Sequence, residues 1–98
     1  MKKNNVKEKN IDLYKAILKL ESLEECISFF EDLCSPNELK SIEQRFEVAK
    51  MLNNDCVYTE ITKTTNASTA TISRVKRMLE YGGNGTMLEI LEKMKEQD

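Results

Sequence analysis

The sequence predicts an all-α domain of about six helices. Apolar residues recur at spacings of three and four along most of the 98-residue chain, which is the period of an amphipathic helix. Two serine-based helix-start signals, at Ser22 and Ser35, divide the first half of the chain. No segment shows the strict alternation of a strand with a hairpin partner. The length suits one domain, expected over residues 10–98, preceded by a polar, Lys-rich flexible arm over residues 1–9.

The first two expected helices are short and apolar on one side. The first spans about residues 10–20, and its stripe consists of Ile11, Tyr14, Ile17 and Leu18. The second begins after Ser22, where Glu25 completes a capping box, and runs to about Cys34. Such faces need a partner surface in a chain this small, so we expect a second copy of the chain to share this core.

The third helix has the strongest start signal. Ser35 can cap it, Pro36 suits the first helical position, and Glu38 can reach back to the cap. It is expected to end near Asn53, and its stripe consists of Leu39, Ile42, Phe46, Ala49 and Leu52. A last helix is expected over residues 86–97, after a glycine-rich hinge.

Residues 56–80 predict a helix-turn-helix. Val57 and Ile61 supply the expected inward contacts of its first helix, and Asn66 suits the positive φ of the turn. Ser68 is placed to cap the second helix. The buried stripe of that helix is expected to consist of Ile72, Val75 and Leu79.

The opposite face of the second helix has the residue types that read duplex DNA. Short side chains lie near its start, where a helix approaches base edges, and cations lie near its end, where phosphates lie. The candidate DNA-binding residues are Ser68, Thr69, Ala70, Ser73, Arg74, Lys76 and Arg77. Two other interpretations stay open: a solvated basic face, and a pairing of Arg74 with an acid such as Glu47 that orients the motif.

Composition narrows the other function classes. The formal net charge of −2 and the pI near 5.3 argue against indiscriminate polyanion binding, so any contact with nucleic acid must be local. The chain has no histidine, and its three cysteines lack zinc-ligand spacing, so we expect no metal and no cofactor. Glycine-rich phosphate loops are missing too, and we expect no enzyme. We also expect no membrane segment, and a cytoplasmic location.

Three segments resemble the Trp repressor superfamily, and more closely its YerC/YecD-type relatives. They are the segments at residues 33–39, 44–52 and 67–77, which read LCSPNEL, QRFEVAKML and ASTATISRVKR. The resemblance covers roughly residues 10–85. It implies an intertwined homodimer whose two recognition helices enter successive major grooves of double-stranded DNA, and a transcription regulator that acts as a repressor.

The resemblance also bears on a small-molecule effector. In the Trp repressor, tryptophan lies between an arginine of the long central helix and the arginine that ends the Thr-Ile-Thr-Arg run. Arg74 matches the second arginine, while either Arg45 or Gln44 matches the first. The family has a glycine after the second arginine, and this chain has Val75 there. An effector pocket would therefore involve Arg45, Arg74 and Val75, but we expect Val75 to fill the space for an indole, so tryptophan is not required.

The sequence leaves one other class of function open. A helical protein-interaction module that has lost DNA binding would also fit the acidic pI and the acid-rich last helix. Sequence-dependent DNA binding at physiological salt would discriminate against that alternative.

Overall fold

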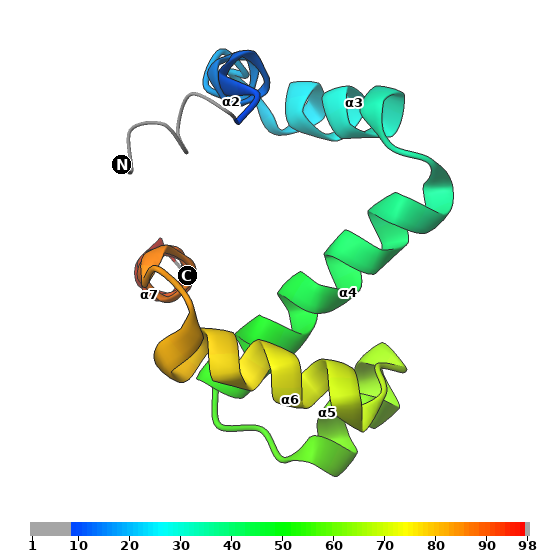
Figure 1. Ribbon diagram of the computed structural model, residues 1–98, viewed down its shortest axis with the longest axis vertical. Helices are drawn as coiled ribbons and strands as arrows, with labels where there is room; N and C mark the ends of the chain where they lie inside the picture. The colour runs from blue at the N-terminus through cyan, green and yellow to red at the C-terminus, as the bar shows by residue number, and fades with distance from the viewer. Residues whose placement is uncertain (1–8, 98) are drawn as a thin grey trace. The chain divides into compact units, whose positions relative to one another are not determined.

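The computed structural model describes residues 9–97, which form six α-helices and one π-helical segment (Figure 1). In chain order these elements are α2 (Ile11–Ile17), α3 (Leu23–Leu33), α4 (Pro36–Asn53), α5 (Tyr58–Thr65), α6 (Thr69–Arg77), η1 (Met78–Gly82) and α7 (Thr86–Gln97). No strand occurs between residues 9 and 97, and the all-α prediction is confirmed. The predicted arm, except for Lys9, lies outside the described residues.

The chain divides into two compact units, one ending at Leu39 and the other beginning at Lys40. In the first unit, the start signal of α4 is realised as a reciprocal capping box. The Ser35 hydroxyl accepts from the backbone N–H of Glu38 at 3.2 Å, and the Glu38 carboxylate accepts from the N–H of Ser35 at 2.9 Å. Both early backbone donors are thus satisfied, and Pro36 opens the helix as predicted.

The helices α2 and α3 differ in detail from the prediction. The α2 helix ends at Ile17 rather than near residue 20, because the N–H groups of Lys19 and Leu20 bond to carbonyls three residues back instead of four. At the start of α3, the Ser22 hydroxyl caps Glu25 at 3.0 Å. The Glu25 carboxylate, however, accepts from the N–H of Glu21, one residue earlier than expected.

The first unit leaves much of its apolar surface exposed. None of its described side chains is buried, and five large apolar ones are at least half exposed: Tyr14, Leu18, Leu23, Ile27 and Leu33. Phe29 and Phe30 pack edge to face with ring centroids 5.4 Å apart. Large exposed apolar patches on soluble proteins often mark interaction surfaces.

The second unit contains the hydrophobic core. Its buried residues come from α4, α5, α6, α7 and the turn between α5 and α6: Val48, Ala49, Met51, Ile61, Ala67, Ile72, Val75 and Leu91. The buried face of α4 therefore includes Val48 and Met51, which the predicted stripe omitted, whereas Ile42 of that stripe is exposed. This core holds the helix-turn-helix against the C-terminal half of α4.

The last helix is attached to the end of α4 by polar contacts as well as by Leu91. Asn53 donates to the Glu92 carboxylate at 2.9 Å, and Lys95 donates to the Asn53 carbonyl at 3.4 Å. The pKa of Glu92 is lowered, mainly by the hydrogen bond from the Asn53 side chain and to a smaller extent by the charge of Lys95. The bounds of α7 agree with the predicted last helix.

Between α6 and α7 the chain passes through the π-helical turn. The N–H of Gly83 donates to the carbonyl of Met78 at 3.1 Å. A Cβ at position 83 would lie 2.8 Å from that same oxygen, so this close approach requires glycine.

Candidate nucleic-acid interface

The turn between α5 and α6 has the geometry that the sequence predicts for a helix-turn-helix. Asn66 adopts φ 63° and donates to the carbonyl of Thr62 at 2.8 Å, which ends α5 in a left-handed cap. Ser68 then accepts from the N–H of Thr71 at 3.1 Å and begins α6. The chain therefore turns from α5 into α6 within residues 66–68.

A second set of contacts makes this turn rigid. The Thr65 hydroxyl donates to the carbonyl of Ile61 at 2.8 Å and accepts from the N–H of Ala67 at 3.1 Å. Ala67 itself is buried in the core. The start of α6 is thus held by both hydrogen bonds and apolar packing.

The two faces of α6 separate as predicted for Ile72 and Val75, whereas Leu79, the third residue of the predicted stripe, lies beyond α6 in η1 and is only half-buried. Ile72 is fully buried, and Val75 keeps only 4% of its surface exposed. The candidate DNA-binding residues are all exposed: Ser68, Thr69, Ala70, Ser73, Arg74, Lys76 and Arg77. In α5, Ile61 faces the core as expected, but the expectation for Val57 is wrong. Val57 precedes the first helical residue, and its side chain is 63% exposed.

Electrostatics favour an anionic ligand at the exposed face of α6. No acidic residue occurs from residue 61 to residue 79. Arg74 and Arg77 form no ion pair with the residues that the structure describes, so the proposed pairing of Arg74 with Glu47 does not occur; Glu47 instead pairs with Lys50. Lys76 differs, because its ammonium lies 3.9 Å from the Glu80 carboxylate.

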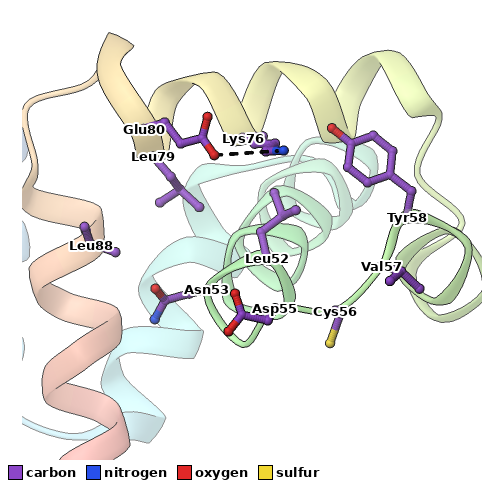
Figure 2. Close-up of a pocket in the computed structure, with 10 residues that line it drawn as sticks. All are labelled: Leu52, Asn53, Asp55, Cys56, Val57, Tyr58, Lys76, Leu79, Glu80 and Leu88. Atoms are coloured by element: carbon purple, nitrogen blue, oxygen red, sulfur yellow. Dashed lines mark ion pairs between the residues drawn. The ribbon is translucent and has the colours of Figure 1, made fainter.

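Tyr58 is a neighbour of this face that the sequence analysis missed. Its hydroxyl lies 3.5 Å from the Ser73 hydroxyl, and the Lys76 ammonium lies 6.0 Å from the centroid of its ring. Figure 2 shows Tyr58 and the Lys76–Glu80 pair on neighbouring parts of one pocket wall. The sequence signal that could have found it is the tyrosine at the first position of α5, because a side chain at that position lies beside α6.

The pocket in Figure 2 is an open hollow of about 820 Å³. Its walls come from the end of α4, the start of α5, the end of α6 with η1, and α7: Leu52, Asn53, Asp55, Cys56, Val57, Tyr58, Lys76, Leu79, Glu80 and Leu88. The pKa of the Cys56 thiol is raised, mainly by partial burial and to a smaller extent by the nearby Glu60 carboxylate. A raised thiol pKa lowers the fraction of thiolate, which is the reactive form of cysteine.

The candidate effector residues are not part of this hollow. The Arg45 guanidinium lies 3.5 Å from the Ser41 hydroxyl, one turn earlier on α4, and is exposed. Arg74 is exposed on α6, and Val75 points into the core. Gln44, the alternative to Arg45, instead donates its side-chain amide to the carbonyl of Thr65 at 3.0 Å.

Residues 9–97 contain neither a metal-binding cluster nor a helix that could span a membrane. Within that range, no three side chains of the types that bind metals come together. None of the described helices combines the length and the apolar content that crossing a bilayer requires.

The fold and the exposed face together define a helix-turn-helix domain of the DNA-binding regulator class. More specifically, the chain belongs to the Trp repressor family, because the family described as Trp repressor protein matches residues 9–95. The chain is 46% identical over 99 residues to the uncharacterized protein YerC of Bacillus subtilis (strain 168), with all of this chain and 94% of that protein covered.

Two solved structures agree with this assignment. A TrpR-like protein from Eubacterium eligens ATCC 27750 has a TM-score of 0.85 and 46% identity, over 93% of this chain and 95% of that chain. A proposed Trp repressor from Staphylococcus aureus has a TM-score of 0.80 and 50% identity, over 86% of this chain and 83% of that chain. The resemblance stated from the sequence is therefore confirmed, and the family is one of regulators rather than enzymes.

Proposed function

We propose that this chain is a sequence-specific DNA-binding repressor of transcription that does not require tryptophan. The observation that carries the proposal is the exposed, acid-free face of α6, held on a buried core by a capped turn. On this proposal, Ser68, Thr69, Ala70 and Ser73 contact base edges in the major groove. Arg74, Lys76 and Arg77 contact guanine or phosphate.

A homodimer is part of this proposal. One α6 helix reads only a few base pairs, and two related by a dyad read both halves of a palindrome about one helical turn apart. The exposed apolar side chains of α2 and α3 support a second copy as the surface that covers them.

Independence from tryptophan is supported by the side chains at the positions that resemble the effector site. Val75 occupies core volume that a glycine would leave free. Gln44 already uses its amide on the Thr65 carbonyl, and Arg45 lies beside Ser41. Calorimetric titration with tryptophan should show no binding, and tight binding would contradict this part of the proposal.

The test of DNA binding compares two charge-removing variants on a duplex enriched by in vitro selection. Arg77→Ala should weaken binding and, because a homodimer loses one phosphate contact in each half-site, reduce the salt slope by about 1.8, twice the value for a single contact on B-DNA. Lys93→Ala removes the same charge from the exposed surface of α7 and serves as the matched control. Equal effects of the two variants would contradict a role for α6. Failure of the unaltered protein to bind any duplex would favour the protein-interaction module.

A further inference from the structure

Gln44 makes a polar contact that connects α4 to the turn of the helix-turn-helix. Its side-chain amide donates to the backbone carbonyl of Thr65 at 3.0 Å, across 21 positions of sequence, and the contact is partly buried. In the described residues, it is the one side-chain hydrogen bond that joins α4 to the segment from α5 to α6. The buried side chains that α4 and this segment contribute to the core are apolar.

The accepting group, the backbone carbonyl of Thr65, needs a hydrogen-bond donor from outside α5. Thr65 is the last residue of α5, and the final carbonyls of a helix have no acceptor role within their own helix. The carbonyl of Thr62 is satisfied by Asn66, while that of Thr65 is satisfied by Gln44. Loss of the glutamine amide would leave a partly buried carbonyl unpaired.

The hydrogen bond between Gln44 and Thr65 lies next to the start of α6, the helix proposed to contact DNA. Thr65 lies three residues before Ser68, the cap of α6, and the turn between them is fixed by Asn66 and by the Thr65 hydroxyl. Displacement of the Thr65 carbonyl would therefore displace the start of α6, where the short base-reading side chains lie. Apolar packing of Ile61 and Ile72 against α4 is non-directional. The hydrogen bond from Gln44 is directional, so it restrains the orientation of the end of α5 relative to α4.

We propose that Gln44 is a positioning residue that holds the start of α6 in its DNA-reading orientation without a bound small molecule. This inference rests on the proposed function and deepens it, because it names the part that makes the reading head competent without an effector. Gln44 itself does not touch DNA. Its effect is on how precisely α6 meets base edges, and hence on sequence preference rather than on general affinity for the duplex.

The variant for the test is Gln44→Met, which keeps the length and volume of the side chain and removes the donor. Ser41→Met is the matched control, since it places the same side chain at an exposed position one turn earlier on α4. Binding of the full-length proteins is measured to the selected duplex and to a scrambled duplex at one salt concentration. Hydrogen exchange of backbone amides is measured without DNA on the same samples.

Gln44→Met is expected to weaken binding to the selected duplex about tenfold, with little change on the scrambled duplex. The amides of Ala67 and Thr71 should exchange faster, while those near Val48 in α4 keep their protection. Ser41→Met should change neither measurement. Equal losses on both duplexes together with faster exchange throughout would show a general structural role and overturn the proposal, as would unchanged sequence preference.

The two proposals fail differently. If the unaltered protein binds neither duplex, the proposed DNA-binding function is wrong. Hydrogen exchange then still decides whether Gln44 orients the turn: unaltered exchange at Ala67 and Thr71 in Gln44→Met would overturn the positioning role.

Discussion

Replacement of Val75 by glycine tests whether this side chain fills the core beside the reading face. Val75 lies on the inward side of α6, keeps 4% of its surface exposed, and belongs to the same buried cluster as Ile61 and Ile72. Val75→Gly should therefore destabilise the protein and open space next to Arg74.

The expected loss has two parts. Valine to alanine removes two buried carbon atoms, at about 0.8 kcal/mol each, and any remaining cavity adds to that cost. Alanine to glycine within a helix adds about 1 kcal/mol. The total is about 2.5 kcal/mol, which for a domain of this size lowers Tm by roughly 10–20 °C.

Urea and thermal unfolding at one fixed protein concentration would measure this loss, because association shifts apparent stability. Val57→Gly is the matched control, since Val57 is exposed at the cap position of α5, where glycine is tolerated. It should cost less than about 0.5 kcal/mol. A Val75→Gly protein as stable as the unaltered one would refute the reasoning.

The same variant tests the effector argument. If Val75 occupies the space of a ligand, tryptophan should raise the Tm of Val75→Gly and leave that of the unaltered protein unchanged. A ligand at 100 times its Kd adds about 2.7 kcal/mol, comparable to the loss from the substitution. A rise in the unaltered protein would contradict independence from tryptophan.

Three other predictions follow from local contacts. Ser35→Ala removes the cap of α4 and should cost about 1 kcal/mol in urea unfolding; no change in the midpoint would show that the capping box is not stabilising. The Cys56 thiol has a raised pKa, so iodoacetamide should label it more slowly than a free thiol at about pH 8, and faster labelling would contradict its partial burial. The pKa of Glu92 is lowered in the folded protein, so its contribution to stability is present at neutral pH and is lost as the pH falls below about 4.3. In Asn53→Ala, the free energy of unfolding should therefore fall less steeply with decreasing pH in this range, and an unchanged pH dependence would contradict this.

Sequence reasoning was accurate where the determining contacts are local. Asn66, Ser68 and the Ser35 capping box each act within three or four residues, so their roles follow from side-chain chemistry. The periodicity of α6 likewise predicted Ile72 and Val75 as buried. The exposed positions of the candidate site follow from the same register.

Tertiary contacts explain the remaining differences. Val48 and Met51 are buried because the helix-turn-helix packs on that side of α4, which helical periodicity alone does not specify. Val57 was misplaced because a pattern of apolar residues does not show where a helix begins. The contact of Gln44 with Thr65 spans 21 positions and depends on the angle between two helices, so no local signal predicts it.

The central claim is that the exposed face of α6 reads a specific DNA sequence without an effector. In vitro selection from random duplex DNA, with purified protein at physiological salt and no tryptophan, tests this claim most directly. The account predicts enrichment of a palindrome whose half-sites lie about one helical turn apart. Failure to enrich any sequence without tryptophan, followed by enrichment once tryptophan is added, would contradict it.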